Sequence, residues 1–361
     1  MSRIKVYVLY GGQSTEHDIS RRSARYVLDH MDREKYEVHP IGISKKGKWI
    51  TQNLKDLDEN PSRELPIGDH SEPDREWSLF DNRDSVSEPV VVFPVLHGSR
   101  GEDGTCQGLF EMKNFAFVGP GVLGSSVSMD KVVAKILVEK AGIPVAPYQY
   151  IERFPWSGLD IQSKHKYLTD CVKTIDFPAF VKPSCSGSSV GITKVEKFDD
   201  LFKAVEYAFQ FDHRVLIETG IKGREIEFAA LGGSDVAITA PGEVANEETF
   251  YTYEEKYSSS SQAQIIIPAP MSDETLLRGK DLALKAFQAL SLWGMARIDF
   301  FLTEHQEYIF NEANTIPGFT SISQYPQLWE HEGIAAKDLI DRLIDSAIER
   351  WRYNNALQRN I

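Results

Sequence analysis

The chain has few cysteines, no long apolar run and no excess of positive charge. Its three cysteines, Cys106, Cys171 and Cys185, are an odd number without the spacing of metal ligands, so we expect reduced thiols in a cytoplasmic protein. No apolar stretch is long enough to cross a bilayer, and the run at residues 4–10 is too short for a signal peptide. The formal net charge of −13 argues against a general binder of nucleic acids or anionic membranes.

The length and the apolar content of the chain predict more than one domain. With 361 residues, of which 42% are hydrophobic, it can bury two or three cores. Strand-like stretches at 4–10, 38–44 and 89–96, with an amphipathic stretch at 14–31 between the first two, form a βαβ pattern typical of a parallel sheet. We therefore expect an α/β fold with a Rossmann-like N-terminal domain over residues 1–123.

The rest of the chain predicts two further domains. An apolar helix face that includes Val132 and Ile136 opens a small central α+β domain, residues 124–218, which we expect to act as a lid. Residues 219–361 predict a mixed, largely antiparallel sheet with helices. The expected central elements are strands at 178–183, 190–195 and 214–218 and a helix at 198–209; the C-terminal ones are strands at 226–231, 264–268, 295–302 and 307–314 and helices at 273–292 and 335–354.

Two C-terminal stretches carry four polar side chains that suit metal ions. If the stretches form a hairpin with a turn of about four residues, Arg297 lies opposite Glu312, and alternation places both on one face with Asp299 and Asn314. Carboxylate and amide oxygens are the hard ligands that Mg²⁺ with nucleotide phosphates prefers. An ion-pair ladder across two strands is the alternative. The Pro-Gly turn at 317–318, which exposes backbone N–H groups beside these side chains, favours the metal-nucleotide site.

A loop of small residues at 183–191 joins two of the central strands. Its N–H groups can approach phosphate oxygens, with Lys182 supplying charge, although a plain glycine hairpin has the same composition. Lys131 is either a solvated surface lysine or a second phosphate clamp.

The stretch 216–223 is either a hinge whose backbone reads an adenine edge or a linker. Residues 251–261 form either a loop that closes over a site or an ordinary surface loop.

Two motifs follow N-terminal strands at their carboxyl ends, where open α/β sheets bind ligands. Residues 11–20 place Glu16 in the first turn of a helix, where it either contacts a ligand or only complements the helix dipole. Residues 97–108 hold four glycines, which indicates a constrained backbone beside a ligand or a tight crossover.

Together these motifs resemble the D-alanine–D-alanine ligases of the ATP-grasp superfamily. Five separated motifs occur in the order of that family: 16–20, 97–108, 182–191, Lys256-Tyr257 and 297–323. The resemblance implies an ATP-grasp fold and the ATP-dependent ligation of two D-alanines to D-alanyl-D-alanine for peptidoglycan synthesis. It also implies that the carboxylate of the first D-alanine attacks the γ-phosphoryl group, and that the amine of the second attacks the resulting acyl phosphate.

The resemblance further implies ligands for the nucleotide and its metals. It assigns Asp299, Glu312 and Asn314 to two Mg²⁺ ions, which Mn²⁺ can replace, and it leaves a monovalent cation open. The implied ATP site consists of Lys131 and Lys182 on the phosphates, the flap residues Ser186, Gly187, Ser188 and Ser189, the adenine hinge Glu218, Thr219, Gly220 and Ile221, and Glu225 on the ribose.

The amino-acid subsites are implied in the same way. Glu16 pairs with the ammonium group of the first D-alanine, with His97 nearby. Glu16, Ser188 and Tyr257 form a network that closes the site. The remaining implied roles are stabilisation of the tetrahedral intermediate by Arg297 and the Gly318 N–H, and binding of the second D-alanine carboxylate by Lys256 and Ser323.

Two other functions compete with this one. A ligase that joins D-alanine to D-lactate or D-serine is the first alternative, but the Lys256-Tyr257 pair favours an amine nucleophile over D-lactate. A non-catalytic nucleotide or amino-acid sensor is the second, and the intact phosphate lysines and metal ligands count against it. From the resemblance we expect a homodimer that acts on D-alanine and ATP, with neither nucleic acid nor membrane as a partner.

Overall fold

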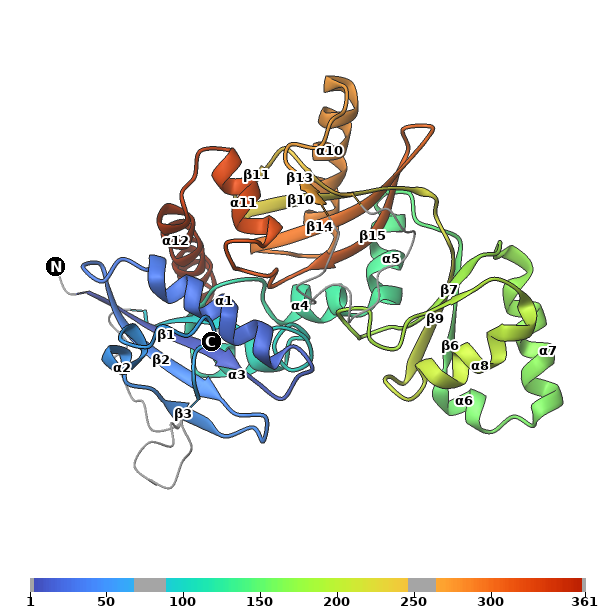
Figure 1. Cartoon of the computed structure of the whole chain (residues 1–361), viewed down its shortest axis with the longest axis horizontal. Helices are drawn as coiled ribbons and strands as arrows, with labels where there is room; N and C mark the ends of the chain where they lie inside the picture. Colours follow the sequence, from blue (N-terminus) through green and yellow to red (C-terminus); the bar gives the residue numbers. More distant parts are fainter. Residues whose placement is uncertain (1–2, 68–88, 246–263, 359–361) are drawn as a thin grey trace.

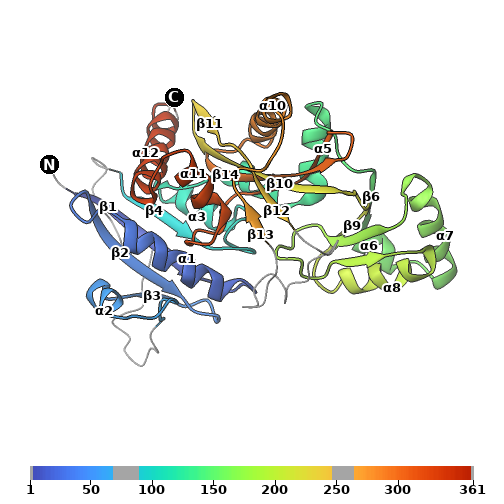
Figure 2. The same ribbon diagram turned by 45° about the horizontal axis from the view of Figure 1, so that its top comes forward.

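The computed structural model describes residues 3–67, 89–245 and 264–358, which form three sheets with their helices. Figures 1 and 2 show the N-terminal sheet in blue, the C-terminal sheet in yellow to orange beside it, and a smaller sheet in green that projects to one side. We call the green part the lid. Among the described residues, no helix is both long and apolar enough to span a membrane.

The N-terminal sheet is parallel except at one edge. Its strand order is β3-β2-β1-β4-β5, and only β3 runs antiparallel to its neighbour. The predicted βαβ unit is confirmed, because α1 connects β1 to β2 and buries Val27 and Leu28 in the core of this sheet. The elements are β1 (Ile4–Gly11), α1 (His17–His30), β2 (Tyr36–Ile43), β3 (Trp49–Thr51), α2 (Leu54–Asp58), β4 (Val91–Val95), α3 (Thr105–Met112), β5 (Ala116–Phe117) and α4 (Val122–Met129).

The C-terminal sheet is antiparallel, as the sequence predicts. Its order is β13-β12-β10-β14-β15, with β11 beside β10. The four predicted strands and the two long helices of this part are present. The elements are β10 (Gly223–Gly232), β11 (Val236–Ile238), β12 (Gly242–Ala245), β13 (Gln264–Ile266), α10 (Asp273–Ala289), β14 (Gly294–Thr303), β15 (Tyr308–Asn314), α11 (Gln324–His331) and α12 (Ala336–Asn355).

The lid is a four-stranded antiparallel sheet in the order β6-β9-β7-β8. It has a hydrophobic core of its own, which includes Trp156, Leu201 and Val215. The sequence predicts β7, β8, α8 and β9, but not β6, α6 or α7. The elements are β6 (Tyr148–Glu152), α6 (Arg153–Ser157), α7 (Ile161–Cys171), a 3₁₀ turn (Val172–Thr174), β7 (Ala179–Pro183), β8 (Thr193–Val195), α8 (Phe198–Ala208) and β9 (Arg214–Thr219).

Helix α5 (Lys131–Lys140) differs from its prediction in the face that it buries. The sequence predicts an apolar face that includes Ile136, yet Ile136 is 45% exposed. Ala134 and Val138 pack instead into the core of the C-terminal sheet, so the helix does not belong by packing to the lid. The same buried face carries Lys131 and Lys135, because both lysines find acidic partners there. The domain boundaries at 123/124 and 218/219 stay a prediction.

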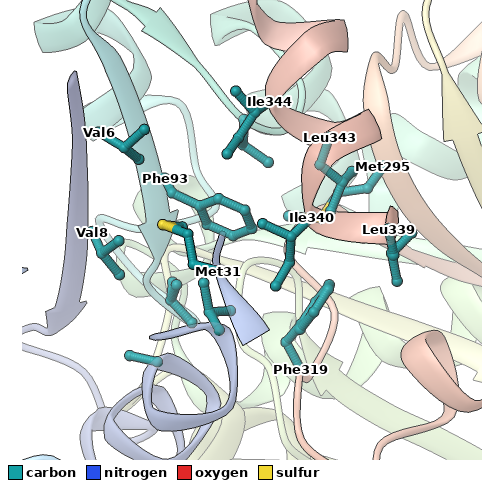
Figure 3. Packing of buried hydrophobic residues seen from close by; sticks show 14 of the residues in the cluster. Val6, Val8, Met31, Phe93, Met295, Phe319, Leu339, Ile340, Leu343 and Ile344 are labelled. Carbon is teal, nitrogen blue, oxygen red and sulfur yellow. The ribbon is translucent and has the colours of Figure 1, made fainter. Parts of the chain in front are cut away.

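One hydrophobic cluster joins the N-terminal sheet to the C-terminal helices. Val6 and Phe93 of the sheet share it with Ile340 and Ile344 of α12, and Phe319, from the turn after β15, belongs to it as well. Figure 3 shows Phe93 facing these α12 side chains, with Phe319 close to Ile340. The N-terminal sheet and the C-terminal helices are therefore packed as one body, whereas the lid has a separate core.

Candidate active site

The hairpin β14–β15 places the four predicted polar side chains on one face, but in a different register. Arg297 lies opposite Asn314 and Asp299 opposite Glu312, with an irregularity between Asp299 and Phe300. The predicted pairing of Arg297 with Glu312 is therefore wrong. The connecting turn shifts the register by one residue and the bulge shifts it by one more. Since side chains alternate along a strand, the second shift returns them to the predicted face.

Asp299 is held from two sides on this face. Arg297 Nε and Nη2 donate to its Oδ1 at 2.9 Å and its Oδ2 at 2.8 Å, and Asn314 Nδ2 donates to Oδ2 at 2.9 Å. Arg297 Nε also lies 3.0 Å from Oε2 of Glu227, on the adjacent strand β10. Burial lowers the pKa of Arg297, but Asp299 and Glu227 together raise it well above its usual range. This guanidinium is therefore a permanent cation.

Glu312 faces a lysine of α5. Lys131 Nζ lies 3.3 Å from Glu312 Oε2 and donates to the Ser186 carbonyl at 2.7 Å. Within the described ranges no three His, Cys, Asp or Glu side chains are arranged to hold a metal ion, so the Asn314 amide is needed to complete a set with Asp299 and Glu312. These hard oxygen donors fit a divalent ion that carries phosphate. Cationic side chains already neutralise both carboxylates, as such an ion would.

Glu218 shares its carboxylate between two lysines. Lys182 Nζ lies 2.5 Å from Oε1, and Lys135 Nζ lies 2.8 Å from Oε2. Burial raises the pKa of Glu218, but the two lysines outweigh it and lower that pKa to about 2. Burial lowers the pKa of Lys135, whereas for Lys182 the effect of burial is exceeded by Glu218 and Glu312, which raise its pKa. The carboxylate is therefore ionised, and Lys182 is already paired with it.

The phosphate loop, residues 184–191, is anchored where it leaves β7. The Lys131 N–H donates to the Ser184 carbonyl at 3.0 Å, and the Cys185 N–H donates to Asp212 Oδ2 at 2.6 Å. Burial and the nearby Asp212 raise the pKa of the Cys185 thiol to about 12. The cysteine in this loop is therefore protonated near neutral pH and contributes to the loop through its backbone.

The tip of the loop reaches the N-terminal motif. Ser188 Oγ donates to Glu16 Oε1, as the resemblance implies for these two residues. Ser188 and Ser189 have φ values of 50° and 60°, a left-handed backbone conformation that residues other than glycine rarely adopt. A Cβ at Gly187 would lie 3.2 Å from Glu16 Oε2, so a side chain at this position would crowd the contact. The loop is thus shaped for a close approach to Glu16.

The predicted adenine hinge offers fewer free N–H groups than its sequence implies. Thr219 N–H donates to the Pro147 carbonyl at 2.9 Å and Gly220 N–H to the Pro178 carbonyl at 2.8 Å. In the described part of the chain, no backbone carbonyl accepts from Ile221 N–H, so this N–H is available to a ligand. Glu225 follows on β10 and contributes to the raised pKa of Lys182.

His97 is buried and uses both ring nitrogens within the protein. Nδ1 lies 2.9 Å from the Ile316 carbonyl and Nε2 lies 2.9 Å from Ser23 Oγ. Because a carbonyl can only accept, Nδ1 carries the proton and Nε2 accepts from the Ser23 hydroxyl. Burial lowers the pKa of His97, and the partial opposing effect of Glu16 does not reverse it. The imidazole is therefore neutral at neutral pH.

Glu102 lies between the N-terminal motif and the turn after β15. Its Oε2 accepts from Gly98 N–H at 2.7 Å and its Oε1 from Ile316 N–H at 3.0 Å. Burial and the negative charge of Glu16 raise its pKa to about 8. The bond to Ile316 N–H thus connects the Glu102 carboxyl group directly to the turn after β15.

The turn itself brings Gly318 next to Ser323. A Cβ at Gly318 would lie 3.0 Å from Ser323 Oγ, and Thr320 N–H donates to the same oxygen at 3.1 Å. Ser323 thus orders the turn and lies beside the predicted oxyanion donor. Lys256 and Tyr257 lie outside the described residues.

Three residues of the site are missing from the sequence prediction: Lys135, Glu227 and Glu102. The sequence could have indicated the first two. Lys135 lies one helical turn from Lys131, and Glu227 lies two positions after Glu225 on the same face of a strand. For Glu102 the glycine-rich motif is the only signal. Its contact with Ile316 joins residues 214 positions apart, which no local pattern indicates.

Comparisons with known proteins show the family to which the chain belongs. Residues 5–120 match the family described as D-ala D-ala ligase N-terminus, and residues 137–345 match D-ala D-ala ligase C-terminus. A D-alanine–D-alanine ligase of Caldicellulosiruptor bescii is 44% identical over 99% of both chains. The structure of the D-alanine–D-alanine ligase from Coxiella burnetii has a TM-score of 0.79 at 33% identity, covering 98% of this chain and 97% of that one.

A second structure is equally similar. VanG D-Ala:D-Ser ligase from Enterococcus faecalis has a TM-score of 0.79 at 33% identity, covering 96% of this chain and all of that one. Since both family descriptions together span most of the chain, and relatives match it over nearly their whole length, membership follows from the sequence as well as from the fold. The protein belongs to the D-alanine–D-alanine ligase family and has its ATP-grasp fold.

Proposed function

We propose that the protein joins two D-alanine molecules to D-alanyl-D-alanine through a D-alanyl phosphate, converting ATP to ADP and phosphate. The observation that carries this proposal is the hydrogen bond from Ser188 to Glu16. It brings a phosphate-binding loop next to a carboxylate that can pair with the ammonium group of an amino acid. The relatives that are named D-alanine–D-alanine ligases support the same substrate.

The nucleotide half of the reaction uses lysines that already hold anions. Lys131 contacts Glu312 and Lys182 contacts Glu218, and in the proposal both lysines transfer to phosphate oxygens while Lys135 continues to neutralise Glu218. Divalent ions bound at Asp299, Glu312 and Asn314 would neutralise the phosphate charge. The other proposed nucleotide contacts are Ser186, Gly187, Ser188 and Ser189 over the phosphates, Thr219, Gly220 and Ile221 at the adenine, and Glu225 at the ribose.

The acyl-transfer half proceeds in two steps. Glu16 holds the ammonium group while the carboxylate of the first D-alanine attacks the γ-phosphoryl group and ADP departs. The neutral amine of the second D-alanine then attacks the acyl carbon, and phosphate leaves. Arg297 and the Gly318 N–H stabilise the negative oxygen that develops between these events. The second carboxylate is assigned to Ser323 and Lys256, and Tyr257 to closing the site against water.

The identity of the second substrate is the point on which a ligase of this fold can differ. The VanG structure, named as a D-Ala:D-Ser ligase, is as similar to this chain as the D-alanine–D-alanine ligase of Coxiella burnetii. Fold similarity therefore does not distinguish D-alanine from D-serine as the second substrate. The Lys256-Tyr257 pair is the sequence feature from which we infer an amine nucleophile rather than D-lactate.

The experiment measures phosphate release from ATP and Mg²⁺ with and without D-alanine, and identifies products by mass. D-Alanine-dependent release with an equal amount of D-alanyl-D-alanine is the expected result. D-Serine, D-lactate and L-alanine are offered in competition with D-alanine at fixed pH. Preferential formation of D-alanyl-D-serine or D-alanyl-D-lactate would reassign the second substrate. ATP binding without D-alanine-dependent turnover would indicate a sensor.

The cellular setting completes the proposal. We infer a cytoplasmic homodimer that supplies a peptidoglycan precursor, with Mg²⁺ or Mn²⁺ as the metal and a monovalent cation as a further component to be tested. Light scattering in solution tests the dimer, and titration of K⁺ against Na⁺ at constant ionic strength tests the monovalent cation. In this proposal the lid moves over the site, while α5, which the prediction places in the same domain (residues 124–218), stays packed on the C-terminal sheet.

A further inference from the structure

The turn after β15 is held from outside by side chains of the N-terminal part. His97 Nδ1 donates to the Ile316 carbonyl at 2.9 Å, and Glu102 Oε1 accepts from the Ile316 N–H at 3.0 Å. One of these bonds fixes the peptide group before Ile316 and the other fixes the peptide group after it. Both side chains come from the loop that follows β4, so a single loop holds the entry to the turn.

A third side chain holds the exit. Phe319 N–H donates to Ser23 Oγ at 3.3 Å, while the Ser23 hydroxyl donates to His97 Nε2 at 2.9 Å. The hydroxyl thus acts once as donor and once as acceptor, and it requires the neutral His97 tautomer derived above. Ser23 is completely buried and His97 is 4% exposed, so water cannot easily replace either bond.

The Gly318 N–H lies between the two held ends. The peptide group after Ile316 is fixed by His97, Pro317 has a restricted φ, and the peptide group after Gly318 is fixed by Ser23. The Phe319 side chain, 2% exposed, is buried in the shared core beside Ile340 (Figure 3). The orientation of the Gly318 N–H is therefore set by three side chains that lie in the N-terminal part.

We propose that Ser23, His97 and Glu102 are positioning residues that align the Gly318 N–H with the oxygen of the acyl group. This inference rests on the proposed function, since Gly318 is assigned there as the oxyanion donor. A donor of this kind acts only if it points at the developing charge before the reaction begins. His97 then acts through the turn, and its ring nitrogens are not needed to contact the substrate.

The main test is Ser23→Ala, with Ser20→Ala as the matched control. Ser20 is a completely buried serine on the same helix, and its two hydrogen bonds, with Gly11 N–H and the Val95 carbonyl, stay within the N-terminal sheet. Ser23→Ala should lower kcat for dipeptide formation about tenfold through misalignment of the donor. The KM for ATP should stay within about twofold, because the nucleotide contacts are intact. More phosphate than dipeptide should be released, since a slow second step leaves the acyl phosphate to water.

Hydrogen exchange measures the positioning independently of activity. Amides of residues 316–320 should exchange faster in Ser23→Ala and in Glu102→Gln than in the wild type, and should be unchanged in Ser20→Ala. Glu102→Gln serves as a second variant because it keeps the shape of the side chain but replaces one acceptor oxygen with an amide NH₂, which can only donate. Its kcat should fall with the same excess of phosphate over dipeptide.

Unchanged exchange at 316–320 in both variants would overturn the inference. Faster exchange with wild-type kcat and full coupling would overturn it as well, because alignment of the turn would then not matter. Equal loss of coupling in Ser20→Ala would do the same by making the effect general to buried serines. A wild-type protein that forms no dipeptide would overturn the proposed function instead, so the two failures appear in different measurements.

Discussion

The two halves of the candidate site are held together by different kinds of interaction. On the nucleotide side, charged side chains are paired with one another: Lys182 with Glu218, and Lys131 with Glu312. On the acyl-transfer side, backbone groups of one turn are hydrogen-bonded to buried side chains such as His97 and Ser23. The first set of contacts has to be exchanged when a charged ligand enters. The second set does not.

The difference follows from when the charge of the bound group is present: on arrival for phosphates and metal ions, and only during the reaction for the oxyanion. Phosphates and metal ions arrive fully charged, so lysines and carboxylates paired beforehand can transfer to them without ever being buried alone. An oxyanion exists only during the reaction, and a donor that had to reorient at that moment would lose its advantage. Packing agrees with this division, because the turn belongs to the shared core, whereas the strand before the phosphate loop belongs to the separate core of the lid.

The largest expected effect is on the nucleotide side, from Glu312→Gln. The amide keeps the size of the side chain but removes the negative charge with which Glu312 would hold divalent ions, so kcat should fall about a thousandfold or more. Thermal stability should change little, since Glu312 is half-buried and has solvent access. Glu304→Gln, at a side chain 80% exposed in the hairpin turn, is the control. Turnover near wild type in Glu312→Gln would contradict the metal assignment.

Lys135→Met sharpens the comparison by removing a cation that does not touch the ligand. Glu218 would then depend on Lys182 alone, and Lys182 would be released less readily to phosphate. The KM for ATP should rise about tenfold, equivalent to about 1.4 kcal/mol, and the melting temperature should fall because a buried carboxylate loses a partner. Lys140→Met, on the exposed end of the same helix, should change neither. An unaltered KM for ATP would show that Glu218 does not restrain Lys182.

Ser188→Ala removes the contact between the phosphate loop and the N-terminal part. It should lower kcat/KM for D-alanine about tenfold, which is the lower end of the contribution of one hydrogen bond to a charged group, and leave unfolding unchanged. Ser234→Ala is a suitable control, because Ser234 Oγ also donates to a glutamate of another element, Glu349, at 2.6 Å and 115 positions along the chain, and neither residue is assigned to the site. Equal effects of the two variants would show that the Glu16 contact has no special role.

The last expected effect concerns stability, and it is a pH dependence on the acyl-transfer side. The pKa of Glu102 is raised from its usual 4.5 to about 8, so between these values the folded protein binds more protons than the unfolded chain. Its contribution to stability is complete below pH 4.5 and is lost as the pH rises through 8. Wild type should therefore lose more melting temperature than Glu102→Gln between pH 5 and 8. Parallel pH profiles of the two proteins would contradict the raised pKa.

Much of the fold is predictable from the sequence because its strongest signals are local. The alternation in β14 and β15 and the strand endings at glycines predict the sheets and the face on which Asp299 lies. The register is not predictable in the same way. No glycine indicates the bulge after Asp299. In the turn, Gln306 has a φ of 62°, a conformation that the sequence would have indicated only with glycine or asparagine at this position.

Many contacts of the site join residues that are far apart along the chain, so local sequence patterns do not indicate them. Apolar periodicity selects Ile136 for the buried face of α5, but the helix buries Lys135 instead. The reason is Glu218, more than 80 positions away, whose carboxylate makes that burial favourable. In the same way, the bonds from His97 and Glu102 to Ile316 join the loop after β4 to the turn after β15. Residue types predict which chemistry is present, whereas the partner of each group emerges only from the folded chain.

The central claim is that nucleotide binding exchanges contacts on one side of the site and leaves the other side fixed. Hydrogen exchange of the full chain, with and without Mg²⁺ and a non-hydrolysable ATP analogue, tests it most directly. We expect increased protection in residues 182–191 and unchanged protection in residues 316–320. Protection of the 316–320 turn that rises together with the phosphate loop would contradict a preformed acyl-transfer side.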